Sequence, residues 1–394
     1  MGFGAIITSG NKNKLLSERL MDCITEVRIE QFLDEPTQFA IRFQEDIVDD
    51  EPMIMKAPEL QCEQMIAIAV DIDGELKCLV RGPITHTQCS TTLGGPGSSV
   101  QVQGQDRRIE LDRKCVRKAW KGRASEAAER ILSDVFDSTD ITRTNIIYGA
   151  PRSGTGQATQ TLNQRFTNEA FLKEIARRNN LCFWLSYECM RDRLDLTGQS
   201  LKIEETANLK PSPPRPQSNG LPKPPVDLIQ LLPNVKVALR VNVMPDQCQN
   251  VTTFKLRVDP EQPNQFSGSA LDESDLNEQS TTATDPQPSI RDKGQRLTAC
   301  QAERDLCITT AGNAVELQNK AEAALTQTGW YVQAKADTTV HMLGGVLAPH
   351  DVLDVEGLGK DNSGPYQVKA VTHVINAADH FMEVGLRRNV VGGG

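Results

Sequence analysis

A proline-rich segment near the middle of the chain divides the sequence into two parts. Residues 211–225 read PSPPRPQSNGLPKPP and contain seven prolines. Proline has a fixed φ and no backbone N–H, so it is excluded from sheet interiors and favours an extended chain. We therefore expect a stiff surface linker over residues 211–226, with a folded region on each side.

Short segments of alternating polar and apolar residues predict β-strands on both sides of this linker. Before it, Phe39, Ile41 and Phe43 alternate with polar neighbours, and residues 65–70 and 76–80 form two further strands around an Asp73-Gly74 hairpin turn. Residues 193–196 and 201–203 suggest another hairpin. After the linker, strands are expected at residues 235–243, 252–258, 330–334, 340–343, 352–355, 366–375 and 381–386. The fold class is therefore α+β and mainly β.

Between the two β regions, residues 166–187 read FTNEAFLKEIARRNNLCFWLSY and predict a helix followed by a strand. Thr167 or Asn168 can cap the helix, and apolar residues follow at helical spacing. Asn179 and Asn180 end it. The apolar run at residues 181–185 is too short for a second helix, so we expect a strand onto which the helix folds back.

Four other segments complete the expected organisation. We expect residues 1–20 to form an N-terminal arm and Ser125 to cap a helix with an apolar stripe. Residues 261–290 carry six acids and no base, which predicts a mobile loop, and a long helix is expected near residues 313–328. The expected domains are a first β domain at 21–110, an α+β insertion at 111–210 and a second β domain at 227–390.

Composition excludes several functional classes. The 394 residues carry a net charge of -9, which argues against a surface devoted to nucleic acid or anionic lipid. No apolar run approaches the roughly 18 residues needed to span a bilayer, and the N-terminus lacks a secretory signal. We therefore expect folding in the cytoplasm. Ten cysteines occur singly with no CxxC spacing, so we expect reduced thiols rather than disulfides or a metal site.

No catalytic, cofactor-binding or metal-binding residues are predicted. Four of the five histidines, His341, His350, His373 and His380, lie in the last 54 residues, but none has a second histidine at i+2 or i+4. Nucleophile elbows, HExxH and dinucleotide fingerprints are also missing, so we expect no enzyme and no cofactor. Residues 107–123 contain eight bases and two acids, for which we expect a solvated face or salt links between subunits.

The order of these parts resembles the late control gene D family, the central baseplate hub proteins of contractile phage tails. This family is related to the hub portion of type VI secretion spike proteins. The matching positions, spread between about residues 20 and 390, are Trp120-Lys121-Gly122, Phe171-Leu172, Phe183-Trp184-Leu185, Gly364-Pro365-Tyr366-Gln367-Val368, Val371-Thr372-His373 and Leu386-Arg387-Arg388-Asn389.

The resemblance implies two β-barrel-like domains per subunit and a homotrimeric, pseudo-sixfold ring in the baseplate of a phage tail or tail-like injection particle. Such a hub would join the sixfold tail tube to a threefold spike. Its partners would be a separate spike protein, the tube or a tube-initiator protein, and baseplate wedge proteins, with no membrane and no specific nucleic acid. The alternatives are a cell-wall-binding or wall-degrading tail component and a soluble ligand-binding β protein with an acidic loop.

Overall fold

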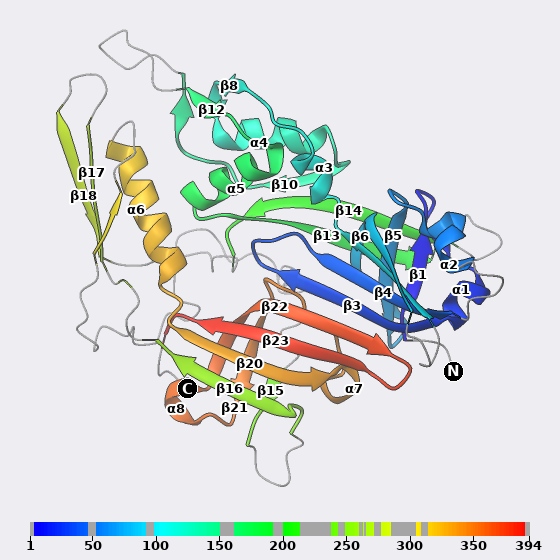
Figure 1. Cartoon of the computed structure of the whole chain (residues 1–394). Coiled ribbons are helices and arrows are strands. Elements are labelled where there is room, and N and C mark those ends of the chain that lie inside the picture. Colours follow the sequence, from blue (N-terminus) through cyan, green and yellow to red (C-terminus); the bar gives the residue numbers. More distant parts are fainter. Residues whose placement is uncertain are drawn as a thin grey trace.

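The computed structural model is a mainly β protein built around one long sheet (Figure 1). It describes residues 4–45, 53–91, 98–149, 161–191, 200–212, 238–242, 249–259, 263, 265–271, 277–284, 305–308 and 314–390. The sheet has thirteen strands: β1 (Ile6–Ser9), β2 (Lys14–Leu15), β3 (Ile24–Phe32), β4 (Gln38–Glu45), β5 (Met65–Ile72), β6 (Glu75–Thr91), β7 (Ser98–Gln105), β15 (Ala238–Arg240), β16 (Thr253–Val258), β20 (Val332–Thr339), β21 (Val352–Glu356), β22 (Gly364–Asn376) and β23 (His380–Arg388).

Strands from the two halves of the sequence join in this sheet, whose order is β16-β20-β23-β22-β3-β4-β7-β6-β5-β1-β2. The junction is the antiparallel pair β22–β3, which runs from Ala370 opposite Phe32 to Asn376 opposite Glu26. Beside the main path, β21 pairs with β22 and with β15. The regions before and after the insertion therefore share one continuous hydrogen-bonded sheet.

The strand order repeats within the sheet. In the group β16-β20-β23-β22 and in the group β3-β4-β7-β6, the strands lie in the order first, second, fourth, third along the chain, and all neighbours are antiparallel. In each group the third strand also pairs with a strand outside the group, β21 or β5. A bulge interrupts each third strand, between Val368 and Ala370 in β22 and between Ile84 and His86 in β6.

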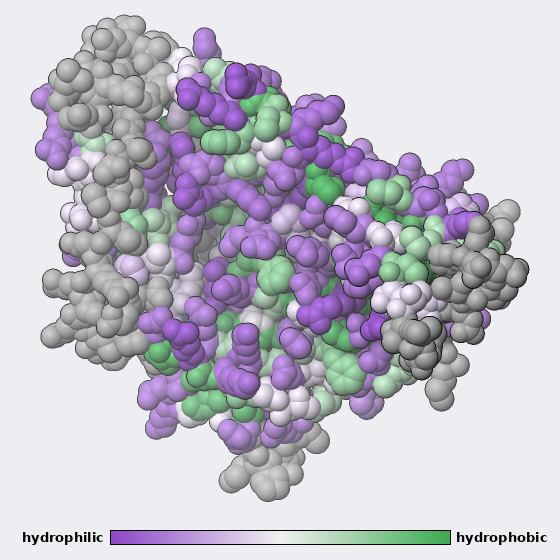
Figure 2. All heavy atoms as spheres, in the orientation of Figure 1, coloured by the Kyte–Doolittle hydropathy of each residue, from purple (hydrophilic) through white to green (hydrophobic). Residues whose placement is uncertain are grey.

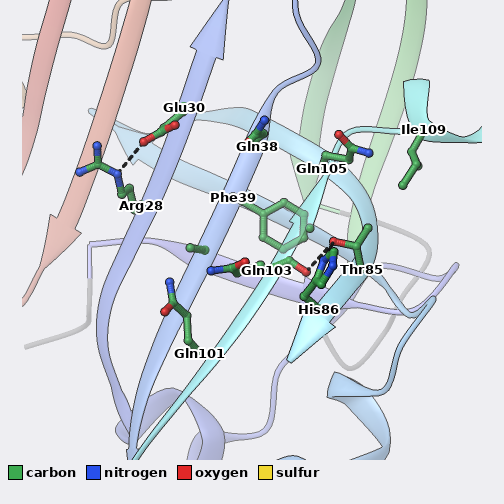
Figure 3. Close-up of a pocket in the computed structure, with 12 residues that line it drawn as sticks. Arg28, Glu30, Gln38, Phe39, Thr85, His86, Gln101, Gln103, Gln105 and Ile109 are labelled. Carbon is green, nitrogen blue, oxygen red and sulfur yellow. Dashed lines mark hydrogen bonds and ion pairs between the residues drawn. The ribbon is translucent and has the colours of Figure 1, made fainter. Parts of the chain in front are cut away.

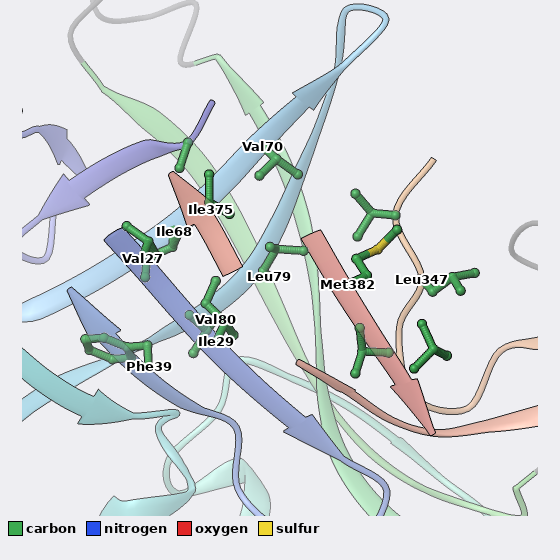
Figure 4. Close-up of a cluster of buried hydrophobic side chains, with 14 of the residues drawn as sticks. Val27, Ile29, Phe39, Ile68, Val70, Leu79, Val80, Leu347, Ile375 and Met382 are labelled. Carbon is green, nitrogen blue, oxygen red and sulfur yellow. The ribbon is translucent and has the colours of Figure 1, made fainter. Parts of the chain in front are cut away.

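One face of the long sheet carries the hydrophobic core. Alternate residues such as Val27, Ile29 and Ile41 are fully buried, and the cluster continues through Val371 and Ile375 of β22. Figure 4 shows Val27, Ile29 and Ile375 of this cluster beside residues of β5 and β6, which include Ile68 and Val80. Because residues of a strand alternate between faces, the same pattern places the polar residues of these strands on the opposite face.

The insertion between the two β regions has its own hydrophobic core. Its elements are α3 (Arg108–Asp112), β8 (Lys118–Trp120), β9 (Gly122–Arg123), α4 (Ala124–Ser133), β10 (Ser138–Ile141), β11 (Ile147–Tyr148), β12 (Leu162–Gln164), α5 (Asn168–Arg178), β13 (Cys182–Arg191) and β14 (Leu201–Lys210). The expected central helix and strand are confirmed as α5 and β13. The Thr167 hydroxyl caps α5 by accepting from the Ala170 N–H, and Asn179 ends the helix.

The sequence-based expectation for residues 261–290 was wrong where the structure describes them. Residues Gln265–Leu271 (β17) and Glu278–Ala283 (β18) form an antiparallel pair, and Asp305–Ile308 (β19) pairs in parallel with β17. The long helix is confirmed as α6 (Ala314–Thr328), and Phe266 and Ala283 pack against its Ala321 and Leu325. Phe266, Gly268 and Ala270 alternate with Ser and Gln, so small side chains hid the strand pattern.

Three other expectations need correction. Residues 1–20 are not simply an arm, because β1 pairs with β5 and Ile7 is buried; α1 (Glu18–Asp22) follows. Residues 340–343, expected to form a strand, form the short helix α7 (Val340–Leu343), which Thr339 caps and Gly344 ends with φ 70°. Ser125 lies inside α4 and not at its N-cap, which is Arg123.

The remaining short helices are α2 (Met53–Lys56), a 3₁₀ turn at Pro58–Leu60 and α8 (Gly359–Asn362). The Asp73-Gly74 hairpin is confirmed between β5 and β6, with φ of 52° and 88° at its two residues. The strand expected at residues 201–203 is part of β14, which pairs with β13. Its expected partner at residues 193–196 and the turn between them lie outside the described residues. So do residues 213–226 of the proline-rich linker.

Candidate assembly surface

The outer face of the first strand group is unusually rich in amides. Gln38 and Ala40 of β4 lie opposite Gln105 and Gln103 of β7, and Gln101 follows two residues away on the same strand. This row of polar side chains covers the face opposite the core. Hydrophilic residues also dominate the side of the molecule seen in Figure 2, where hydrophobic residues form only small patches. We call this face, over β3, β4, β7 and the second part of β6, the polar sheet face.

A shallow groove of about 510 Å³ lies on the polar sheet face. Figure 3 shows the glutamines of β4 and β7 in it, with Arg28 and Glu30 of β3 at one side and Thr85 and His86 of β6 at the other. Arg28 Nε lies 2.8 Å from Glu30 Oε1, and His86 Nδ1 lies 2.9 Å from the Thr85 hydroxyl. The polar part of the lining consists of four glutamines, the Arg28–Glu30 ion pair, Thr85 and His86, which suits direct or water-mediated hydrogen bonds.

This face was not singled out from the sequence. Its signal is present in residues 100–105, where Val100, Val102 and Gly104 alternate with Gln101, Gln103 and Gln105. That alternation identifies a half-buried strand but does not tell which neighbouring strands extend the polar surface. The grouping depends on the sheet order, which local sequence does not determine.

Two adjacent arginines at the end of β7 attach the insertion to the first β region. Arg107 Nη1 lies 2.9 Å from Glu205 Oε2 of β14, and Arg81 Nη1 of β6 lies 3.4 Å from the same oxygen. Arg107 also binds Glu110 through Nε at 2.8 Å. Burial raises the pKa of Glu205, and the two guanidinium groups oppose that shift. A single carboxylate therefore connects β14 to β6 and to the start of the insertion.

The second arginine, Arg108, points into the insertion itself. Its Nη2 lies 2.5 Å from Glu169 Oε1 in the first turn of α5, and its Nη1 donates to the Phe183 carbonyl of β13 at 3.0 Å. The guanidinium also stacks 4.5 Å from the Phe183 ring, and the Arg108 side chain is 1% exposed. Both arginines are thus structural. They account for two of the eight bases at residues 107–123, and both pair with acids of the same chain.

The structure brings two of the four C-terminal histidines together, which their spacing in sequence did not suggest. His373 of β22 and His380 of β23 face each other across a hairpin, with Nδ1 and Nε2 3.0 Å apart, and His373 Nε2 lies 3.1 Å from Gln31 Oε1. Burial lowers the pKa of His380 to about 4 and that of His373 well below its ordinary value. Both rings are therefore neutral near pH 7 and make structural hydrogen bonds.

The other two histidines lie apart from this pair. His350 stacks 3.9 Å from the Trp184 ring and contacts the Ser212 hydroxyl at 2.7 Å, and burial lowers its pKa to about 3. His341 lies exposed on α7. Within the described residues, no three His, Cys, Asp or Glu side chains are grouped so that they could hold a metal ion. In the same residues, no helix is long and apolar enough to cross a bilayer.

Comparison with solved structures places this architecture among phage tail proteins. A tail protein from Neisseria meningitidis MC58 matches at 14% identity and a TM-score of 0.61, covering 98% of this chain and 97% of that one. A 43 kDa tail protein of prophage MuSo2 from Shewanella oneidensis matches at 12% identity and the same TM-score, covering 98% of both chains. This chain has the phage tail protein fold.

The same fold extends to type VI secretion. An Escherichia coli component of that system, described as structurally similar to two tail proteins of bacteriophage T4, matches at 11% identity and a TM-score of 0.51. That match covers 93% of this chain and 73% of the other. No family description and no curated protein matches the sequence. At these identities the likeness establishes the tail-protein fold and leaves function to be argued from the molecule.

Proposed function

We propose that this protein is the central baseplate hub of a contractile phage tail or tail-like injection particle, and that it acts as a homotrimer. The observation that carries the proposal is the repeated strand order of the long sheet, in which two groups of four strands follow each other with the same topology. Three copies of such a chain present six similar units, and a ring of six units fits a sixfold tube while the chain itself remains threefold.

The division of the chain fits this role. The first β region (21–110) and the second (227–390) would each occupy one sixth of the ring, and the insertion (111–210), held by Arg107 and Arg108, would lie outside it. The partners would be the tail tube or a tube-initiator protein on one side, a separate spike protein on the other, and baseplate wedge proteins around the rim.

The same site supports a structural rather than an enzymatic role. The groove on the polar sheet face offers amides and a closed Arg28–Glu30 pair, and the buried histidines are neutral and hydrogen-bonded. The protein would therefore function in the tail baseplate without a cofactor, and wall digestion would belong to another subunit.

Electron micrographs of the purified protein test this proposal. If the protein is a hub, the micrographs should show ring-shaped particles with a central channel. A cell-wall-binding or wall-degrading component instead predicts solitary subunits that bind or clear purified peptidoglycan. Solitary particles with peptidoglycan binding would overturn the hub assignment in favour of that alternative.

A further inference from the structure

The two groups of four strands end in two edges that have no partner among the described residues. On one side the edge is β16, which pairs only with β20. On the other side it is the second part of β6, because residues 75–83 pair with β5, whereas residues 86–91 pair with β7 alone. An unpaired edge exposes backbone N–H and C=O groups that can hydrogen-bond to another strand.

The chain already contains a template for how these edges meet. At the β22–β3 junction, the third strand of one group pairs with the first strand of the next. β6 and β16 occupy those same positions at the outer ends. The eight strands alternate in direction, so β16 and β6, the first and the eighth, are oppositely directed. A second copy that continues the sheet beyond β6 in the same orientation therefore presents its β16 antiparallel to β6, as β3 is to β22.

The strand registers determine which residues correspond. His86, Gln103, Ala40 and Arg28 lie opposite one another across the first group. Counted from the equivalent bulge, Ala370, Gly385, Lys335 and Lys255 do so across the second. Arg28 therefore corresponds to Lys255 and Ile29 to Leu256. Likewise, His86 corresponds to Ala370 and Cys89 to His373.

Side chains at the two outer edges are more exposed than their counterparts at the internal junction, as expected if a neighbouring strand is missing from each edge. At the internal junction His373 lies opposite Ile29, and both are 0% exposed. Their counterparts Cys89 and Leu256 are only partly buried at the margin of the same core, as is Phe254, and Val258 is 42% exposed. A strand laid along each edge would complete the burial of these side chains.

We propose that β16 of one copy pairs antiparallel with residues 87–91 of β6 in a second copy, with Leu256 opposite Cys89 and Lys255 opposite Ser90. This pairing rests on the proposed homotrimer and specifies its subunit contact. The contact reproduces between chains the junction that β22 and β3 make within one chain, so each ring has six similar junctions, three within chains and three between them.

A cross-link between the native Cys89 and Leu256→Cys tests the pairing. Residues directly opposite in antiparallel strands have Cα atoms about 4.5–5.5 Å apart, which suits a disulfide. Mild oxidation of L256C is expected to give species of two and three linked chains on a non-reducing gel, and C89S/L256C should lose them. Because L256C alters an apolar position, S90C/K255C provides a second predicted pair on the polar side and should link equally well.

Controls separate the register from assembly itself. K255C alone places its thiol on the opposite face from Cys89 and should link poorly. A particle that sediments as a trimer but forms neither cross-link, or in which K255C links to Cys89 as well as L256C does, would overturn this pairing while leaving the hub intact. A protein that sediments as a single chain would refute both proposals.

Discussion

At the scale of single residues, buried charges hold the insertion in place. Glu205 is 7% exposed and accepts from both Arg81 and Arg107, whereas its neighbour Glu204 is 55% exposed and pairs with the exposed Lys202. Adjacent residues of one strand thus carry the same carboxylate in opposite environments. Removal of a buried carboxylate leaves its former arginine partners poorly solvated. Removal of an exposed carboxylate leaves a partner that water can solvate.

We therefore expect Glu205→Ala to lower the free energy of unfolding by about 3 kcal/mol and Glu204→Ala to change it by under about 1 kcal/mol. Urea unfolding followed by circular dichroism measures both. Equal effects of the two substitutions would show that the Glu205 contacts with Arg81 and Arg107 contribute little.

The buried histidines predict sensitivity to acid. Burial lowers the pKa of His380 from 6.5 to about 4, so between these values the unfolded chain binds a proton that the folded chain does not. Stability from His380 is complete above pH 6.5 and is lost as the pH falls toward 4. Burial has the opposite effect on Asp106 and Asp351, whose pKa values rise from 3.8 to about 6, so these two carboxyls offset part of the loss.

Comparison of the wild type with His380→Asn cancels the carboxyl contribution. The loss of unfolding free energy between pH 7 and pH 4.5 should be smaller in H380N by about 2 kcal/mol, because the variant has no imidazole to protonate on unfolding. Urea titrations at the two pH values give this difference. An equal loss of unfolding free energy in the wild type and in H380N would mean that His380 is not held neutral in the folded protein.

At the scale of elements, the sequence predicted those helices and turns whose ends are determined by neighbouring residues. The α5 helix was recoverable because Thr167 and Asn179 mark its ends, and the β5–β6 hairpin because Asp73-Gly74 suits a turn with positive φ at both positions. β17 and β18 were missed because packing against α6 stabilises strands that are rich in Ser, Thr and Gln. Likewise β1 was missed because a four-residue strand depends on its neighbour β5.

The hairpin turn gives a test at this scale. Gly74 has φ of 88°, and a Cβ there would meet no atom within 4 Å, so the cost of a side chain comes from the backbone alone. Gly74→Ala should destabilise the protein by about 1 kcal/mol, and Gly74→Asn by less, since Asn tolerates this conformation. Thermal unfolding ranks the two variants. Equal stability of G74A and the wild type would contradict the turn assignment.

At the scale of the whole molecule, the sequence predicted a mainly β chain but not how its halves meet. The two strand groups show no evident sequence similarity, and their common order depends on pairings between residues as distant as Phe32 and Ala370. The candidate surface has the same origin, because the glutamines of β4 and β7 form one face only after the sheet assembles. Composition and motifs offered no candidate catalytic residues and could not place this face.

The central claim is that two similar strand groups in each chain allow three chains to form a six-unit ring. The mass of the purified protein in solution, from sedimentation equilibrium at micromolar concentration, tests it most directly. The chain mass is 43.4 kDa, so the account predicts a particle of about 130 kDa. A single species at the mass of one chain would contradict it.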